Sequence, residues 1–448
     1  MNPVRKLFYR LYRLYSGLRY WALRRFTKPG LAMLGALMTV GVAGVDLDLS
    51  ASYQAFILLL CLMLVAVCFA GSFRARFTAN RLLPALGTVG SPFSYRIVLR
   101  NLSTRTQIGL TLLENLADPR PSYKDWRATQ RAEEKRVRSF RVSPGRRANR
   151  FKLATVRQAE VPAAAPNQET EVRVELTPLR RGVLRFDGIT LARPDPLGLF
   201  RAFVTIPLPQ AALILPKRYL LPPIALPGTM KYQEGGVALA ASVGQSDEFV
   251  ALRDYRNGDP LRHIHWRSWA KAGKPVVKEF EDEFFVRHAL VLDTFTDHQH
   301  SEVFEEAVSV AASFVCTVQT QESLLDLLFV GPQSYCFTAG RGLAREDQML
   351  EILAAVRACP DRSFQALEHL VLSHVGALSG CICVFLEWDE ERRGFIDKLC
   401  RLGVPVLVLV IVEPGGDPSP DPGPLRDAPH RFHVLQIGRI QESLANLT

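Results

Sequence analysis

Three aspartates in the C-terminal half are placed where they could bind a divalent cation. Asp293 and Asp297 follow one continuous apolar run, and Asp389 follows another. In open parallel sheets, ligands bind beyond the carboxyl ends of the strands, and carboxylates are the hard oxygen ligands that Mg²⁺ prefers. Phe295, which lies between the two nearer aspartates, has no ligand atom. The spacing therefore indicates a possible position for a metal site, but it does not provide a complete set of ligands.

A second cluster of chemically capable residues occupies residues 244–283. This stretch concentrates Arg, Trp, Tyr, His and Asp around a turn at 257–259. One interpretation is structural, with ion pairs that join Arg253, Arg262 and Lys271 to Asp254, Asp259 or Glu248. The other makes the stretch a docking surface or sensor. Trp266 and Trp269 share one helical face, and we expect them to cover a core.

The elements that must position the aspartates alternate between strands and helices. Continuous apolar runs predict strands at 288–293, 324–330, 381–388, 404–412 and 432–437, with a hairpin partner near 334–338. Amphipathic or capped stretches predict helices at 301–322, 345–358, 364–375 and 389–402. Strands buried on both faces that alternate with helices are typical of a doubly wound α/β domain with a parallel sheet.

The segment before this domain has a different pattern. Short alternating runs at 95–101, 108–115, 151–156, 171–177 and 182–200, separated by turn residues, predict a β-sandwich of immunoglobulin type over 75–215. A basic insertion, 120–152, interrupts it; this is either a solvated loop or a loop that touches the membrane. Prolines from Pro207 to Pro227 predict an extended connector, and we place the connector at 216–245, before a unit that spans 246–448.

The net charge of +11 is unevenly distributed along the 448 residues. Residues 1–28 carry eight basic side chains and no acidic one, and residues 120–152 carry twelve basic and three acidic ones, so residues 153–448 are net acidic. The basic insertion lacks the regular aromatic residues of a single-stranded nucleic-acid groove. We therefore expect no nucleic-acid partner.

The first basic block precedes two apolar segments within 29–73, separated by Asp46 and Asp48. About 20 apolar residues span a bilayer core, so the segments predict a two-helix transmembrane hairpin; a cleaved signal peptide is the alternative. Basic flanks stay cytoplasmic, which places the N-terminus and the large C-terminal part in the cytoplasm. Residues 1–28 form a basic amphipathic tail. It is either a helix on anionic headgroups or a loosely ordered segment.

The cluster at 244–283 resembles the signature of bacterial domain-of-unknown-function family 58. The matching residues are Glu248, Phe249, Leu252, Arg253, Tyr255, Gly258, Asp259, Arg262, Ile264, Trp266, Ala270, Lys271, Val277, Lys278, Phe280 and Glu281. Residues 180–182 and 195–200 also resemble an upstream element of that family. The resemblance implies a membrane-anchored bacterial protein of the cytoplasmic (inner) membrane, whose C-terminal domain is similar to a von Willebrand factor A domain. It implies protein partners, including a MoxR-type AAA+ ATPase, and no catalytic activity.

An A-type domain of that kind binds Mg²⁺ through a D-x-S-x-S motif, and this chain departs from the motif. Residues 293–297 read Asp-Thr-Phe-Thr-Asp, so Phe295 and Asp297 stand at the two serine positions. Thr294 or Thr296 would serve only if the loop were shifted. We expect a degenerate site of Asp293, Asp297 and Asp389 with no cofactor, and Mg²⁺ as the ion if one binds.

Three functions follow, in order of preference. The first is a non-enzymatic membrane-anchored adaptor that docks partner proteins, with an AAA+ ATPase among them, in the assembly or maturation of a complex. The second is a divalent-metal-dependent protein-binding module that uses the three aspartates. The third, a metal-assisted hydrolase, has little support because the sequence has no Walker A, G-x-S-x-G or H-E-x-x-H motif.

Overall fold

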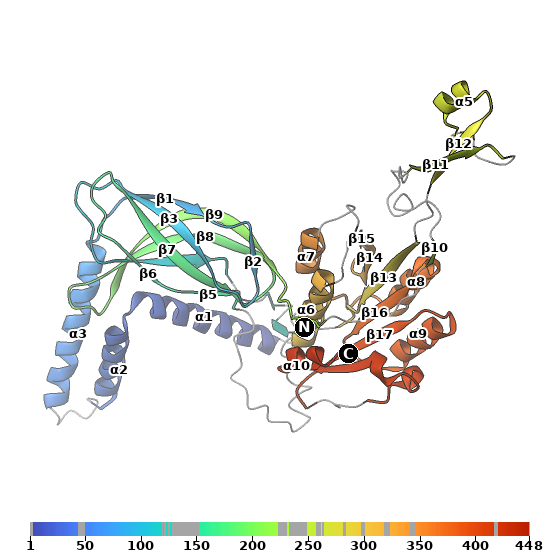
Figure 1. Cartoon of the computed structure of the whole chain (residues 1–448). Helices are drawn as coiled ribbons and strands as arrows, with labels where there is room; N and C mark the ends of the chain where they lie inside the picture. Colours follow the sequence, from blue (N-terminus) through green and yellow to red (C-terminus); the bar gives the residue numbers. More distant parts are fainter. Residues whose placement is uncertain are drawn as a thin grey trace. The chain divides into compact units, whose positions relative to one another are not determined.

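The protein is described here from a computed structural model, shown in Figure 1. It describes residues 3–43, 50–118, 120, 122–123, 126–127, 152–222, 231–232, 249–256, 261, 264–280, 284–296, 301–317, 323–340, 346–415 and 420–447. The chain divides into two compact units, Met1–Leu215 and Pro216–Thr448. The division falls at the start of the predicted connector.

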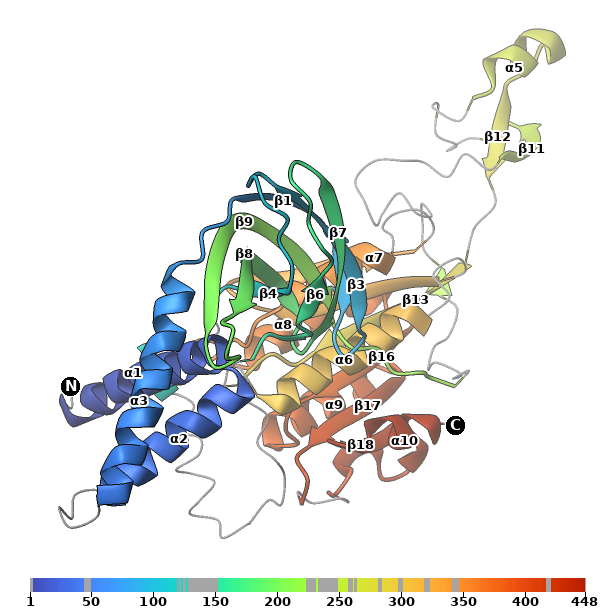
Figure 2. The same cartoon turned by 90° about the vertical axis from the view of Figure 1, so that its left-hand side faces the viewer.

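Three helices begin the first unit: α1 (Pro3–Arg25), α2 (Lys28–Ala43) and α3 (Ser50–Gly71). Of the two alternatives that the sequence left open for the basic tail, the structure has the helix. Within α3, Tyr53–Gly71 is long and apolar enough to cross a membrane, while α2 is apolar but shorter than a typical span. α2 and α3 pack against each other, and α1 runs across their direction rather than along it (Figures 1 and 2).

Two sheets follow and face each other across one core. The first sheet has the strand order β1-β3-β7-β5 and the second β2-β9-β8-β4-β6. Their bounds are β1 Phe77–Leu82, β2 Leu86–Thr88, β3 Phe93–Asn101, β4 Leu110–Leu116, β5 Ala154–Val156, β6 Ala159–Val161, β7 Glu169–Pro178, β8 Gly182–Pro194 and β9 Arg201–Leu215. Inward side chains of both sheets, among them Ile97, Val174 and Ile189, are fully buried in this core.

The longest strand of this unit, β9, contains two of the prolines that indicated an extended connector. Pro207 and Pro209 lie inside β9, and the connector placed at 216–245 begins directly after the last residue of this strand, Leu215. The β8–β9 pairing shifts register between Phe186 and Gly188, and Pro207 is opposite Gly188 at this irregularity. Strand prolines are tolerated at bulges because no ladder N–H is required there. The prolines therefore bend a strand and do not end the sheet.

The second unit contains an α/β domain with a mixed, mainly parallel sheet. Its order is β15-β14-β13-β16-β17-β18; β15 is antiparallel to β14, and β10 pairs with β13. The strands are β10 Lys231–Tyr232, β13 Phe284–Leu292, β14 Ser323–Val330, β15 Ser334–Ala339, β16 Gly380–Phe385, β17 Val406–Val412 and β18 Phe432–Gln436. The predicted α/β class and strand order along the chain are confirmed.

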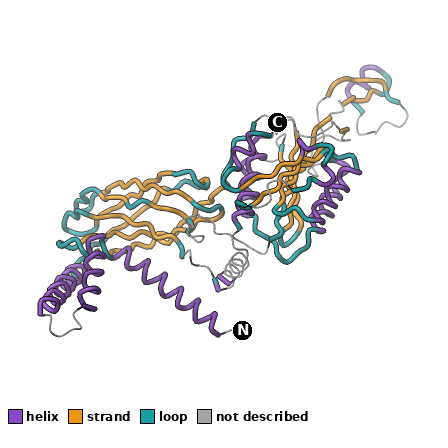
Figure 3. The backbone as a smooth tube through the Cα atoms, turned by 90° about the horizontal axis from the view of Figure 1, so that it is seen from below, coloured by secondary structure: helices purple, strands orange, loops and turns teal. Residues whose placement is uncertain are grey.

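Helices on both faces cover this sheet, as Figure 3 shows in purple around the orange strands. They are α6 (Glu302–Thr317), α7 (Glu346–Ala355), α8 (Gln365–His374), α9 (Glu390–Arg401) and α10 (Ile440–Ala445). One core joins α8 and α9 to the sheet through Leu367, Phe395 and Val408. The first residues of the predicted connector also pack on this domain: the backbone N–H of Tyr219 donates to Ser313 Oγ at 2.8 Å, and its hydroxyl donates to Glu306 at 2.6 Å.

A small separate element precedes the α/β domain in the sequence. Strands β11 (Phe249–Asp254) and β12 (Val276–Phe280) form an antiparallel pair, and the short helix α5 (Trp266–Ala272) lies between them in the chain. We call these residues, 249–280, the signature hairpin. It contains the described part of the stretch that the sequence marked as informative.

Candidate functional site

The candidate site begins at Asp293, which directly follows β13 and is completely buried. Its Oδ1 accepts a hydrogen bond from the backbone N–H of Phe295 at 3.0 Å, and its Oδ2 accepts one from Leu386 N–H at 3.3 Å. β13 and β16 are parallel neighbours, so their carboxyl ends lie at one edge of the sheet. This topology brings the loop after β16 to Asp293.

The start of α9 supplies a cation to this carboxylate. Arg392 is 5% exposed and donates to Asp293 Oδ2 through Nε at 3.0 Å and Nη2 at 2.9 Å. Its Nη1 pairs with Asp389, whose Oδ1 also accepts the Arg392 backbone N–H at 3.0 Å and so caps α9. The guanidinium therefore lies between two of the three aspartates that the sequence proposed as metal ligands.

Aromatic packing holds the guanidinium in place. The Phe364 ring centroid is 4.8 Å from the Arg392 guanidinium carbon. Phe364 in turn makes edge contacts with Phe295 and Phe385, at centroid distances of 5.9 Å each. A cation over a ring face is favoured most where water is excluded. Phe295, which cannot bind a metal, thus belongs to the apolar wall of the site.

The electrostatics of the pair are those of a buried ion pair. Burial raises the pKa of Asp293, whereas the Arg392 guanidinium and the two backbone amides oppose this rise by stabilising the carboxylate. Burial lowers the pKa of Arg392, but Asp293 and Asp389 outweigh this effect and raise its pKa overall. Arg392 therefore stays charged, and its charge balances that of Asp293.

The described residues of this site do not fit Mg²⁺. No group of three His, Cys, Asp or Glu side chains arranged to hold a metal occurs among them. The Thr294 hydroxyl donates to the carbonyl of Val330, away from Asp293. Asp297 lies outside the described residues. Since Arg392 already occupies the space between Asp293 and Asp389, a metal ion there would have to displace a buried guanidinium.

The signature residues are only partly described. Glu248, Gly258, Asp259, Arg262 and Glu281 lie outside the described residues, and Phe249 is described for its backbone in β11 alone.

In the described part of the signature hairpin, an ion pair joins Asp254 to a lysine that the sequence did not propose. Asp254 pairs with Lys274 at 2.7 Å, and Arg253 Nη1 donates to the Asp254 carbonyl at 3.2 Å. Tyr255 joins the two strands through its backbone N–H, which donates to the Pro275 carbonyl at 3.0 Å. Lys271 lies in the last turn of α5 and is exposed.

The tryptophans of this hairpin correct another expectation. Trp266 and Trp269 do share a helical face, and their rings stack at 5.2 Å with an interplanar angle of 17°. However, Trp266 is 65% exposed, and no residue of α5 is buried. The pair therefore covers no core within the described residues. α5 is a single short helix beside β12, and Trp266 stays largely exposed on it.

The upstream element at 195–200 forms a compact loop in the first unit. The buried carboxylate of Asp195 accepts backbone N–H bonds from Leu197, Leu199 and Phe200 at 2.9, 2.7 and 2.6 Å. The loop meets the corner between α1 and α2: Thr27 N–H donates to the Leu199 carbonyl at 3.1 Å, and the Thr27 hydroxyl donates to the Gly198 carbonyl. The element therefore fixes the helical corner to the β-domain.

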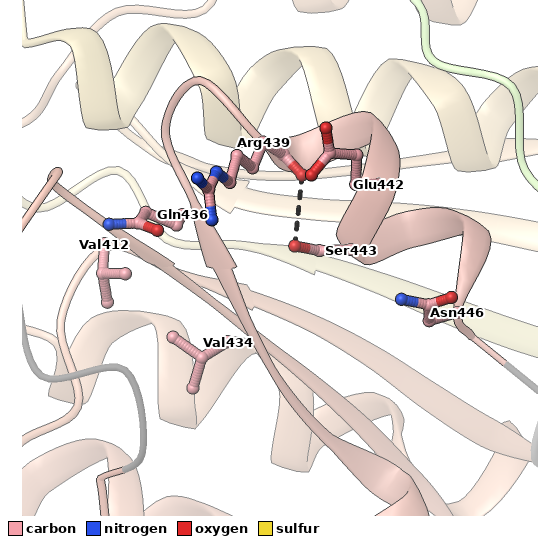
Figure 4. Close-up of a pocket in the computed structure, with 7 residues that line it drawn as sticks. All are labelled: Val412, Val434, Gln436, Arg439, Glu442, Ser443 and Asn446. Carbon is pink, nitrogen blue, oxygen red and sulfur yellow. Dashed lines mark hydrogen bonds between the residues drawn. The ribbon is translucent and has the colours of Figure 1, made fainter.

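A shallow hollow of about 260 Å³ lies at the outer edge of the α/β sheet (Figure 4). It is lined by Val412, Val434, Gln436, Arg439, Glu442, Ser443 and Asn446. Ser443 Oγ donates to the Arg439 carbonyl at 3.2 Å, which is the hydrogen bond drawn in Figure 4. None of the residues predicted to act in the site lines this hollow.

The signature hairpin from residue 251 onward, β13 and Asp293 fall within a match to a known family. The model of the family described as "Protein of unknown function DUF58" matches residues 251–379. An uncharacterized protein of Bacillus subtilis (strain 168), YeaD, is 27% identical over 184 residues, which are 40% of this chain and 44% of that protein. The chain thus covers less than half of that relative.

Solved structures add no argument about fold or function. A cohesin module from a Clostridium perfringens ATCC13124 family 33 glycoside hydrolase is 10% identical, covers 32% of this chain and 98% of its own, and has a TM-score of 0.13. A GH20 exo-β-N-acetylglucosaminidase from Vibrio harveyi is 8% identical, covers 80% of this chain and 60% of its own, and has a TM-score of 0.12. Both scores are too low to support a shared fold.

Proposed function

We propose that the protein is a membrane-anchored, non-enzymatic adaptor that docks partner proteins in the assembly or maturation of a complex, with a MoxR-type AAA+ ATPase among them. The observation that carries this proposal is the position of Arg392 between Asp293 and Asp389. A guanidinium held there supplies from within the chain the positive charge that a metal ion would bring. Docking would then need no bound cation.

The anchor in this proposal is a helical hairpin of α2 and α3. The apolar window Tyr53–Gly71 supports one span by length, and α2 is its packing neighbour. Basic residues stand at the outer ends of both helices, from the α1 segment and from Arg74 and Arg76. Such flanks favour the cytoplasmic side, so we propose two spans with both ends in the cytoplasm of a bacterial cell.

At the level of fold, we propose an immunoglobulin-like sandwich followed by a von Willebrand factor A-like domain. Two antiparallel-dominated sheets that share one core support the first assignment. A parallel five-strand sheet with an antiparallel edge strand, covered by helices on both faces, supports the second. Asp293 at the end of the central strand β13 is where an A-type domain would begin its ligand loop.

The signature hairpin is the docking surface of the proposal. Trp266 is largely exposed, stacks on Trp269 and is followed in the sequence by Arg267. Within the described residues 249–256, 261 and 264–280, six residues are basic and two are acidic. Tryptophan and arginine are enriched among the hot-spot residues of protein interfaces. The positive charge of the hairpin favours an acidic surface on the partner.

Site-specific cross-linking in native membranes tests the proposal. The full chain carries p-benzoylphenylalanine in place of Trp266, and the cross-linked proteins are identified by mass spectrometry with and without EDTA. We expect a MoxR-type ATPase in both samples. The matched control places the same photoreactive residue at Arg401, whose side chain is 78% exposed on α9.

Three results would contradict the proposal. The first is the absence of any AAA+ ATPase from the Trp266 cross-links. The second is a cross-link that EDTA abolishes and Mg²⁺ restores, which would favour the metal-dependent binding module. The third is turnover of phosphate esters or nucleic acid by the purified chain that Asp293→Ala removes, which would favour a hydrolase.

A further inference from the structure

The N-terminal helix α1 has an apolar stripe that no described residue covers. Leu7, Leu11, Leu14 and Leu18 follow one another at intervals of four, three and four residues, which places them on one face. They are 58%, 52%, 71% and 61% exposed. An exposed leucine row over three turns is costly in water, at about 25 cal/mol for each Å² of apolar surface.

The opposite face of α1 is occupied by protein. Tyr9 and Tyr12 contact the Trp126 ring at centroid distances of 5.5 and 6.3 Å. Arg120 Nη1 donates to the Arg13 carbonyl at 3.4 Å. The first residues of the basic insertion thus lie on the face of α1 that is turned away from the leucines, so these contacts leave the leucine face open to another surface.

The C-terminal end of α1 is fixed with respect to the helical hairpin. The bridge between Phe26 and Phe200 and the Thr27 bonds hold it to the 195–200 loop. Leu199 and Phe200 pack into a small cluster with Ala66 of α3. α1 therefore leaves the top of the hairpin at a set angle, and it runs beneath the β-domain and across the hairpin direction (Figure 1).

The charge of α1 indicates what kind of surface it meets. Its eight basic residues, counted to Lys28, include Arg10 and Arg19 on either side of the leucine row, and the segment has no acidic residue. Anionic phospholipids attract such a helix by about 1 kcal/mol for each basic residue near the headgroups. A protein partner would bind a surface of mixed polarity. A leucine row that is bordered by basic residues matches a lipid interface instead.

We propose that α1 lies in the plane of the membrane, with its leucine row among the acyl chains of an anionic leaflet and its arginines at the phosphates. The proposal rests on the membrane anchoring proposed above, because the hairpin brings α1 to the bilayer. In this position α1 is a strut between the bilayer and the β-domain. It would hold the β-domain at one orientation to the membrane surface.

A fluorescent probe of polarity tests this inference on the full chain. A genetically encoded solvatochromic amino acid replaces Leu14, and the protein is placed in nanodiscs of phosphatidylcholine with one quarter phosphatidylglycerol. We expect emission shifted to the blue relative to the same probe at Arg96, a side chain 61% exposed in β3. The shift should be smaller in nanodiscs of phosphatidylcholine alone.

Each negative result of these experiments leads to a different conclusion. If carbonate extraction releases the chain from cell membranes, the proposed anchoring is wrong and the inference is lost with it. If the chain stays in the membrane but the Leu14 probe emits like the Arg96 probe, the anchoring holds and the in-plane helix is wrong; a protein partner would then cover the leucines. An equal blue shift in both lipid compositions would overturn the role of the arginines.

Discussion

Arg392 donates to one oxygen of Asp293 through both Nε and Nη2, at 3.0 and 2.9 Å, although the two residues are 99 positions apart. The contact joins the end of β13 to the first turn of α9 and is fully buried. It gives the carboxyl edge of the sheet a permanent internal cation. Loss of either partner would leave the other charged and buried, so the pair should act as a structural unit.

Replacement of Arg392 by Met tests this unit. The substitution keeps the length of the side chain but leaves Asp293 buried without its counter-charge, which we expect to cost about 3–5 kcal/mol of unfolding free energy. The measurement is native-state hydrogen exchange of the amides in β13 and β16. Arg401→Met is the control, because Arg401 pairs with Asp397 at the surface of the same helix and should cost less than about 1 kcal/mol. Equal effects of the two substitutions would contradict the role of the buried pair.

Divalent cations should leave the stability of the protein unchanged. Since Arg392 lies between Asp293 and Asp389, Mg²⁺ or Mn²⁺ gains no pair of free carboxylates there. We expect no heat of binding in calorimetry and the same melting temperature in EDTA and in excess Mg²⁺. A rise of the melting temperature with Mg²⁺ that Asp293→Asn removes would show that the ion displaces the guanidinium.

His288 predicts a pH dependence of the α/β domain. It is 5% exposed in β13, its Nδ1 has no hydrogen-bond partner among the described residues, and burial lowers its pKa. A base whose pKa is lowered on folding binds fewer protons in the folded state. Stability is therefore complete above the unfolded value, about 6.5, and is lost as the pH falls below it, by at most about 1.4 kcal/mol per pH unit.

His288→Leu should flatten that dependence between pH 7 and 5. The measurement is the pH profile of hydrogen exchange in β13. His369→Gln removes an exposed histidine of α8 and should leave the profile as it is. A profile that His288→Leu leaves unchanged would mean that another group takes up the proton.

Much of the α/β domain is predictable from the sequence, because its strands are continuous apolar runs and its helices have a clear period. The end of β13 and the position of Asp293 follow directly. The partner of Asp293 cannot be predicted in this way, because the sequence gives Arg392 no feature that distinguishes it from other basic residues of a helix that begins at Asp389. Its role depends on the parallel pairing of β13 with β16, a contact between residues far apart in the chain.

Two other features that the sequence did not predict, the path of β9 and the exposure of Trp266, have local causes. The prolines of β9 indicated a linker, but Pro207 stands at the register shift opposite Gly188, where the strand needs no N–H. Trp266 indicated a core residue because large aromatic side chains are usually buried. It is exposed because α5 is a single short helix on a two-stranded pair. Neither the bulge nor the exposure of Trp266 can be derived from residue type.

The β-domain contains a second buried ion pair that can be tested independently. Arg81 and Glu114 have fully buried side chains 2.9 Å apart, and the Tyr95 hydroxyl donates to Glu114 at 2.7 Å. Burial raises the pKa of Glu114 against the effect of Arg81. Glu114→Gln leaves the Arg81 charge without its partner, and we expect a loss of about 3–5 kcal/mol, measured by hydrogen exchange in β3 and β4.

The matched control in the same sheets is Glu171→Gln. Glu171 is 3.5 Å from Arg96, and both side chains are more than half exposed, so the change should stay below about 1 kcal/mol. Tyr95→Phe should lie between the two, at about 1.5–3 kcal/mol, because it removes one hydrogen bond to a charged group. A loss for Glu114→Gln no larger than that for Glu171→Gln would mean that Arg81 finds other acceptors.

Gly30→Ala tests whether the 195–200 loop fixes the corner between α1 and α2. A Cβ at Gly30 would lie 1.9 Å from the Leu199 carbonyl oxygen, so the loop and the helix would have to separate. Gly35→Ala, one and a half turns further along α2, meets no atom within 4 Å and is the matched control. We expect Gly30→Ala to lower the melting temperature of the detergent-solubilised chain and to speed hydrogen exchange at Thr27 and Leu199, while Gly35→Ala changes neither. If both variants behave like the unmodified chain, the corner is not held by this contact, and the orientation of α1 must depend on its contacts with Trp126.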